Sequence, residues 1–109
     1  MAIEDGAALG ECLDRARSGR DLRRVLHAFE AIRKPRCERI QANSRDLGHM
    51  WHLPDGAQQE KRDKAMKATA VQGDLNPNKF ADEEFQAWMF GYDVFTTVCL
   101  CVPNLIGPS

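Results

Sequence analysis

The sequence lacks both an excess of one charge and a long apolar run. Its 109 residues include 15 Lys or Arg and 16 Asp or Glu, and this balance excludes a uniformly basic nucleic-acid binder. It contains no apolar stretch of about 18 residues, the length that a membrane span needs. Acidic residues follow soon after Met1, where a secretory signal would have basic and apolar regions. We therefore expect a cytoplasmic protein that binds neither nucleic acid nor a membrane.

Aromatic and cysteine residues are few. The chain has two Trp, one Tyr and five Phe, and a domain of this length buries only about two-thirds of the surface of its unfolded chain. We therefore expect it to associate with a partner or with a second copy of itself. The four cysteines are expected to be free thiols, because a reducing compartment does not sustain a disulfide framework.

The sequence also lacks the common motifs of nucleotide binding and hydrolysis. Neither a Gly-x-Gly-x-x-Gly loop nor a phosphate-binding loop occurs, so we expect no cofactor in the isolated chain. There is no Gly-x-Ser-x-Gly turn for a serine nucleophile. No Glu, Asp or Cys pair near His49 and His52 completes a set of four metal ligands, and Cys99 and Cys101 are separated by one residue instead of the two usual in zinc sites. We expect no metal site.

Three residues are the best candidates for acid–base chemistry: His49, His52 and Asp55. They form a cluster of titratable residues beside Trp51 and a turn. Side chains of these types can exchange protons with a substrate near neutral pH. The alternative interpretation, that they are ordinary polar residues of a surface loop, stays open.

Apolar residues recur with helical spacing in the first half of the chain. Residues 2–17 favour an amphipathic helix, whose first turn carries acidic residues as a helix N-terminus prefers. Residues 18–20 form a turn signal, and Asp21 can cap a second helix that extends to residue 48. The expected apolar stripes are Ala2, Leu9, Leu13 and Ala16 in the first helix, and Leu22, Val25, Leu26, Phe29 and Ile32 in the second. The two helices should form an antiparallel hairpin.

Proline and loop residues punctuate the remaining helical pattern. Pro35 removes a backbone donor and disfavours helical geometry at Lys34, so we expect a kink or a tight break followed by another helix. Residues 57–70 predict a weakly anchored surface helix, because their apolar content is low. A loop at 73–80 should precede a last short helix that ends near Gly91.

Residues 95–109 form an uncharged tail rich in Thr, Val, Cys and Leu. This run could pair as a strand over residues 96–102, limited by Pro103, or pack as an arm on another surface. The expected fold is a small all-α domain, a helical hairpin plus short helices. Its helical unit spans residues 1–94 and is followed by the apolar C-terminal tail.

Charge is unevenly distributed although it nearly cancels overall. Residues 15–39 contain nine Lys or Arg and three acidic residues, a net charge of +6, which leaves −7 for the rest of the chain. One interpretation is a patch for an anionic ligand. The other, which we favour because no aromatic stacking platform accompanies the basic residues, is a solvated helix face with internal ion pairs.

Four blocks of the sequence resemble one enzyme family. The opening MAIEDGAALGECL resembles the helix that follows the second flavin-binding loop in FAD-dependent aromatic hydroxylases of the salicylate hydroxylase type. FEAIRKPRCERIQANSR resembles the Tyr/Phe-Glu-x-x-Arg-x-Pro-Arg block of that family. Its matching residues are Phe29, Glu30, Arg33, Pro35, Arg36, Gln41 and Ser44. WHLPDGAQQEKRD and NPNKFADEEFQAWMFGYDV look like the C-terminal region of the fungal branch.

The resemblance implies the end of such an enzyme. Full members are several times longer and carry FAD on a Gly-x-Gly-x-x-Gly unit and on a Gly-Gln-Gly-Ala-Asn loop, neither of which this sequence contains. The tail from Phe95 departs from the family. By resemblance, Arg33 and Arg36 brace the hairpin against acidic positions in the opening helix.

Two hypotheses follow from the resemblance. In the first, the chain is a C-terminal fragment of a fungal FAD-dependent monooxygenase and is not an autonomous flavoenzyme. It would act as a homodimer or with a partner that supplies the nucleotide-binding domain, on a small aromatic or polyketide-type substrate of secondary metabolism. In the second, it is a flavin-free cyclase or isomerase that orients a substrate in an apolar cavity between helices.

Overall fold

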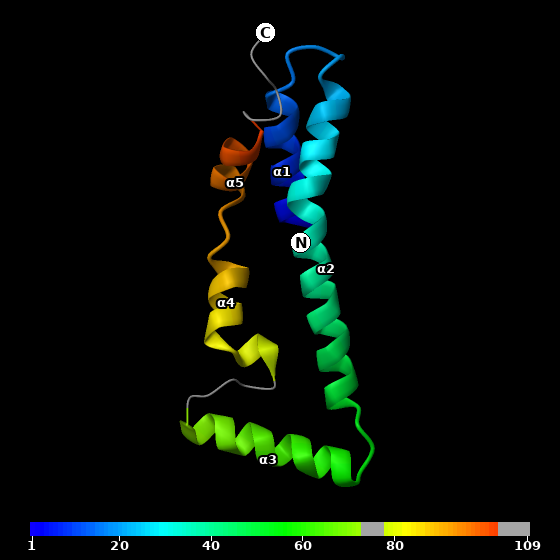
Figure 1. Cartoon of the computed structure of the whole chain (residues 1–109), viewed down its shortest axis with the longest axis vertical. Coiled ribbons are helices and arrows are strands. Elements are labelled where there is room, and N and C mark those ends of the chain that lie inside the picture. Colours follow the sequence, from blue (N-terminus) through cyan, green and yellow to red (C-terminus); the bar gives the residue numbers. More distant parts are fainter. Residues whose placement is uncertain (73–77, 103–109) are drawn as a thin grey trace. The chain divides into compact units, whose positions relative to one another are not determined.

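The protein is all helical over the residues that its computed structural model describes, which are 1–72 and 78–102, with side chains for 1–68 and 78–102. No strand occurs in these ranges, so the expected all-α fold is confirmed. The helices are α1 (Ala2–Asp14), α2 (Leu22–Trp51), α3 (Ala57–Gln72), the 3₁₀ helix η1 (Lys79–Ala81), α4 (Glu83–Phe90) and α5 (Val94–Cys101) (Figure 1). None of the described helices is both long and apolar enough to cross a membrane. The expected loop at 73–80 lies mostly outside the described residues.

Helices α1 and α2 form the antiparallel hairpin expected from the sequence (Figure 1). Asp5 pairs with Arg33, and Glu4, one position earlier in α1, reaches Arg36, which is later in α2. This order shows that the two helices run in opposite directions. The turn between them is ordered by a hydrogen bond in which the backbone N–H of Arg17 donates to Asp21 Oδ2 at 3.1 Å. The hairpin is therefore held both at its turn and near the N-terminus of α1.

The buried face of α1 differs from the expected stripe of Ala2, Leu9, Leu13 and Ala16. Ala8 and Cys12 are fully buried, whereas Leu13 is 41% exposed. Glu4 binds the arginines of α2 and therefore faces that helix. Ala8 and Cys12 follow at intervals of four residues, so they lie on the same face of α1 as Glu4. The predicted stripe is wrong at Ala2 and Leu13, which are exposed, because the ion pairs of Glu4 rotate α1 so that Ala8 and Cys12 face inward.

Helix α2 is continuous and has Pro35 in its interior. A proline at this position leaves the carbonyl of Ala31 without its usual N–H partner. Arg33 and Arg36 lie on either side of the proline, and their buried side chains are fixed to α1, which offsets the lost bond. The expected break at Pro35 is therefore wrong, whereas the expected kink stays a prediction.

Residues for which the sequence left a strand open as one of two alternatives form helix α5. The carboxylate of Asp93 caps it by accepting hydrogen bonds from the backbone N–H groups two and three positions later, at 3.0 and 3.2 Å. Helix α5 packs against α1. The buried residues here are Val94 and Val98 of α5 and Val102, which directly follows it. Burial at a spacing of four overrides the preference of valine for strands, so the strand over 96–102 is wrong. The rest of the tail, residues 103–109, lies outside the described residues.

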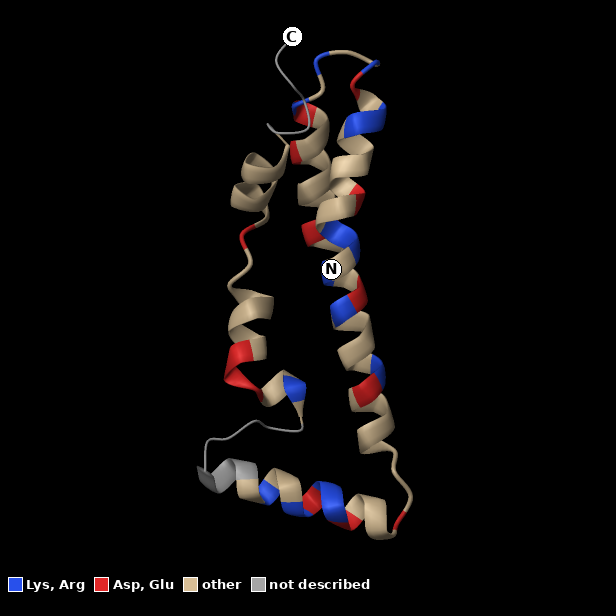
Figure 2. Ribbon diagram, in the orientation of Figure 1, with Lys and Arg blue, Asp and Glu red and all other residues tan. Residues whose placement is uncertain are grey.

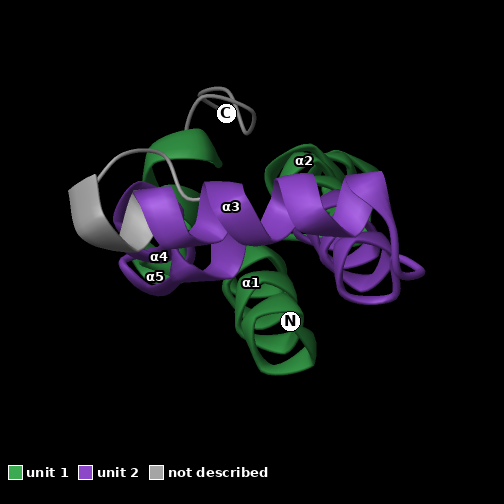
Figure 3. Ribbon diagram, turned by 90° about the horizontal axis from the view of Figure 1, so that it is seen from below, with its two compact units in different colours: residues 1–39, 93–109 green, residues 40–92 purple. Residues whose placement is uncertain are grey.

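Contacts divide the chain into two compact units (Figure 3). Unit 1 comprises residues 1–39 and 93–109, and unit 2 comprises residues 40–92. Within the described part of unit 1, the buried apolar residues are Ala8, Cys12, Val25, Ala28, Val94, Val98 and Val102. Leu22 and Leu26, which belong to the expected stripe of α2, are each 43% exposed.

In unit 2, α3 is attached to the end of α2 by one arginine. Arg62 Nη1 donates a hydrogen bond to the carbonyl oxygen of Met50 at 2.8 Å, and the same guanidinium pairs with Asp63 at 2.7 Å. None of the described side chains of α3, residues 57–68, is buried. The expectation of a weakly anchored surface helix is confirmed.

Helix α4 begins and ends close to the positions expected from the sequence. Asp82 caps it by accepting a hydrogen bond from the backbone N–H of Phe85 at 3.3 Å. Phe85 is 3% exposed, stacks on Trp88 and meets the edge of Phe80, with ring centroids 5.4 Å apart in both pairs. These aromatic contacts link η1 to α4.

Gly91, which ends α4, is predicted to be intolerant of a side chain. A Cβ atom there would lie 2.6 Å from the carbonyl oxygen of Ala87, which already accepts the N–H of Gly91. We expect Gly91→Ala to lower the free energy of unfolding by about 1–3 kcal/mol, measured by urea titration with circular dichroism. Gly48 is the matched control, because a Cβ there meets nothing within 4 Å inside α2. Gly48→Ala should stabilise by about 0.5–1 kcal/mol; equal effects of the two substitutions would contradict the argument.

Candidate functional site

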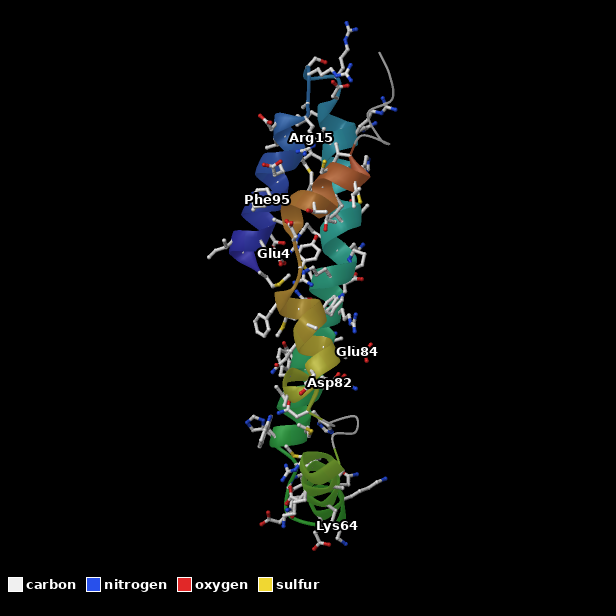
Figure 4. All side chains as sticks on the ribbon, turned by 90° about the vertical axis from the view of Figure 1, so that its left-hand side faces the viewer. Glu4, Arg15, Lys64, Asp82, Glu84 and Phe95 are labelled. Atoms are coloured by element: carbon white, nitrogen blue, oxygen red, sulfur yellow. The ribbon has the colours of Figure 1, made fainter. Side chains whose placement is uncertain are left out.

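Among the described residues, an ionic cluster joins α1 to α2; we call it the brace. It consists of Glu4, Asp5, Arg33 and Arg36. Arg33 Nε donates to Asp5 Oδ1 and Arg33 Nη2 to Glu4 Oε2, both at 2.7 Å. Arg36 binds Glu4 through two parallel hydrogen bonds of 3.0 Å. The brace that the resemblance implied is therefore present, and Glu4 binds both arginines. Figure 4 labels Glu4 on α1.

Burial makes the brace sensitive to the loss of any member. The side chains of Arg33 and Arg36 are only 3% and 6% exposed, whereas Glu4 is 22% exposed. Burial by itself would raise the pKa of Glu4, but hydrogen bonds from Arg36 and Arg33 outweigh it, so the pKa is lowered from its usual 4.5. Two cations and two carboxylates make the cluster neutral, as a buried set of charges requires.

Cys37 lies at the edge of the brace. Its Sγ atom donates to Asp5 Oδ1 at 3.7 Å and accepts from Arg33 Nη2 at 4.0 Å. A groove of about 350 Å³ opens here within unit 1. It is lined by Asp5, Phe29, Glu30, Arg33, Lys34 and Cys37. The groove has the polar groups to orient a small ligand, but its strongest charges are already paired with each other.

Figure 2 shows the basic residues of the segment between residues 15 and 39 in blue. At least four of its nine basic residues form ion pairs. Besides the two arginines of the brace, Arg15 pairs with Glu11 at 2.7 Å, and Lys34 lies 3.9 Å from Glu30. Among the described residues, those of the segment that form no ion pair are Arg17, Arg20, Arg23 and Arg24. The interpretation of a helix face with internal ion pairs is supported.

A second groove, of about 560 Å³, lies along the first turns of α2 in unit 1. It is lined by Gly19, Leu22, Arg23, Leu26, His27 and Glu30. The lining of this groove combines apolar, basic and acidic side chains, so it does not favour one class of ligand.

The predicted acid–base residues His49, His52 and Asp55 are all exposed. The ring of His52 lies with Nδ1 2.7 Å from the carbonyl oxygen of Gly48, so one of its nitrogens is engaged at the end of α2. No group of three His, Cys, Asp or Glu side chains suited to a metal ion exists in the described part of the chain. A catalytic role for the three residues stays a prediction.

Sequence reasoning missed a group of cysteines. Cys12 on α1 is buried, and burial raises the pKa of its thiol. Cys101 of α5 is half-buried and lies near it, and exposed Cys99 contacts the guanidinium of Arg15. Cys12 is separated from Cys99 and Cys101 by more than 80 positions in the sequence, so the packing of α5 on α1 brings it near them. No local sequence signal could have found this group.

Sequence comparison relates the chain to FAD-dependent monooxygenases. It is 32% identical over 103 residues to an FAD-dependent monooxygenase of Beauveria bassiana, which covers 94% of this chain and 24% of the relative. It is 34% identical over 93 residues to a 3-amino-4-hydroxybenzoate 2-monooxygenase of Streptomyces platensis, covering 85% of this chain and 20% of the relative. An FAD-dependent monooxygenase of Arthrinium sp is 31% identical over 88 residues, with shares of 81% and 21%.

The chain thus spans a quarter or less of the length of these curated relatives. Neither a protein-family profile nor a solved structure matches it. The resemblance expected from the sequence is confirmed, and it extends from fungal to bacterial enzymes: the chain is homologous to a segment of FAD-dependent monooxygenases.

The brace predicts a loss of stability in acid that depends on Glu4. Because folding lowers the pKa of this carboxyl, its ionised form favours the folded state. That contribution is fully present above pH 4.5 and is lost as the pH falls further. We expect Glu4→Gln to destabilise the protein by about 2–4 kcal/mol at pH 7, because two buried arginines lose their shared partner, and by less at pH 3.5.

The measurement is the free energy of unfolding from urea titrations at the two pH values. Glu60→Gln on α3 is the matched control, since Glu60 is exposed. It should change stability by less than about 0.5 kcal/mol at either pH. If Glu4→Gln and the unmodified chain lose the same free energy of unfolding between pH 7 and pH 3.5, protonation of Glu4 does not cause the loss of stability in acid, and the prediction is wrong.

Proposed function

We propose that this chain is the helical segment that supports the flavin site of an FAD-dependent monooxygenase. The observation that carries the proposal is that its similarity to such enzymes spans most of the chain but only 20–24% of their length. These 109 residues contain no Gly-x-Gly-x-x-Gly loop. The proposal therefore assigns FAD binding to residues outside them, whether on the same polypeptide or on a partner.

The brace suggests how the segment would act. By resemblance, α1 is the helix that follows a flavin-binding loop, so the position of its first turn matters for the cofactor. Glu4 and Asp5 lie in that turn and are tied to α2, which fixes the direction of the backbone N–H groups at the N-terminus of α1. Their carboxylates are neutralised by the arginines and so do not repel an electron-rich ligand. FAD would supply the activation of dioxygen, and this chain would supply rigid support.

The names of the relatives support a choice of substrate class. The protein from Streptomyces platensis is named for 3-amino-4-hydroxybenzoate, a small aromatic acid. We extend this to a small aromatic or polyketide-type substrate in secondary metabolism, with a cytoplasmic location in keeping with four free cysteines.

The proposal predicts that FAD binding needs more than this chain. The chain alone should bind FAD with a dissociation constant in the millimolar range or weaker, because it lacks loops of oriented amide donors. The Beauveria bassiana relative, produced without the segment that matches this chain, should bind FAD more tightly when this chain is added. Flavin fluorescence during titration measures both affinities.

Variants separate support from non-specific association. Arg36→Ala, which breaks the brace, should reduce the gain in FAD affinity about tenfold or more, whereas Lys64→Ala, on the exposed surface of α3, should leave it unchanged. Micromolar binding by the isolated chain, or no gain on mixing, would overturn the proposal. A colourless chain that alters the products of a cyclisation or isomerisation would favour the flavin-free alternative.

Exposed apolar side chains of unit 1 support association with a second copy or a partner. Ile3 on α1 is 91% exposed, and Phe95 and Leu100 on α5 are 56% and 68% exposed. We expect the isolated chain to be a dimer at tens of micromolar, since covering about 800 Å² per partner matches a standard interface. Light scattering measures this. Replacing both Phe95 and Leu100 by Ser should give a folded monomer, and a monomeric unmodified chain would contradict the prediction.

A further inference from the structure

Three of the four cysteines lie on α1 and α5, two helices that pack against each other in unit 1. Cys12 on α1 is fully buried, as are Val98 and Val102 of the facing segment. Cys101 lies three positions after Val98 and directly before Val102, so it borders the surface that α5 buries. It is half-buried, whereas Cys99 is exposed. Chain packing therefore presents one buried and one partly accessible thiol at the same helix interface.

The arrangement pairs Cys12 with Cys101 rather than with the other cysteines. Cys12 and Cys101 are near enough for the charge of one sulfur to act on the other. Cys99 contacts Arg15, and Cys37 is engaged with Asp5 in the brace. Each of the other two thiols thus has a polar partner of its own.

We propose that Cys12 and Cys101 form a reversible disulfide when the protein meets a peroxide, and that this bond fastens α5 to α1. Cys101, the more accessible of the two, reacts first. Its sulfur attacks one oxygen of hydrogen peroxide, the O–O bond breaks, and a sulfenic acid and one water form. The sulfur of Cys12 then attacks the sulfur of Cys101, the S–O bond breaks, and hydroxide leaves with the Cys12 proton as a second water. Two thiols lose two electrons and the peroxide gains them.

The bond would change the stability of unit 1. Cys12 and Cys101 lie near opposite ends of the sequence, although α5 packs against α1. A disulfide between them closes a long loop and therefore restricts the conformations of the unfolded chain. In the reduced protein, non-covalent contacts hold α5 on α1, among them the packing of its valines and the contact of Cys99 with Arg15. Oxidation would therefore replace the non-covalent contact between α1 and α5 by a covalent bond, which a thiol reductant would break again.

The test uses the full chain, reduced and then treated with hydrogen peroxide. After alkylation of the remaining thiols, mass spectrometry should find two cysteines protected, a mass about 2 Da below the reduced chain before alkylation, and a linked pair of peptides containing Cys12 and Cys101. The melting temperature should rise by about 5 °C or more and return on addition of dithiothreitol.

Cys101→Ser should abolish the linked peptides and the thermal shift, and Cys99→Ser, two residues away on the same helix, should keep both. Any of three results would overturn the proposal: full alkylation of Cys12 and Cys101 after peroxide, a sulfinic acid at Cys101 without a link, or a link that uses Cys99 or joins two chains. The peptide map of the unmodified chain decides among these even where a variant folds poorly.

Discussion

The pairing of two buried arginines with two acidic residues is the constraint on which unit 1 depends. A guanidinium taken out of water costs several kcal/mol unless carboxylates satisfy it, so α1 can occupy only the position where Glu4 and Asp5 meet Arg33 and Arg36. That position turns Ala8 and Cys12 inward. The same rotation of α1 creates the surface on which α5 packs. One set of ion pairs therefore determines two helix contacts.

The helices were largely predictable because their signals are local. Apolar spacing and capping residues placed α1, α2, α3 and α4 to within a few residues. The errors arose where a distant contact outweighs local preference. Pro35 continues a helix because the arginines around it are fixed to α1, and the valines of α5 are helical because α1 buries them. The contacts of these arginines and valines with α1 join segments far apart in the sequence, so the sequence of one segment does not predict them.

The candidate site divides in the same way. The arginine pair was implied by the resemblance, and its spacing of three places both side chains on one helix face. The acidic partners were visible only as a charged first turn, since nothing local distinguishes a carboxylate that favours a helix dipole from one that binds an arginine. The sequence predicts His49, His52 and Asp55 only from their chemical types and from their closeness in the chain. The structure shows that one ring nitrogen of His52 contacts the carbonyl oxygen of Gly48. It does not test whether the three residues take part in catalysis.

The attachment of α3 has an evolutionary consequence. Arg62 holds the end of α2 through the carbonyl oxygen of Met50, a main-chain atom that every residue type would offer at that position. Drift of the side chain at position 50 therefore leaves the bond intact, whereas a change at position 62 removes it. Of the two ends of this contact, only one is exposed to selection, so covariation between the two positions should be absent among homologues even though they touch.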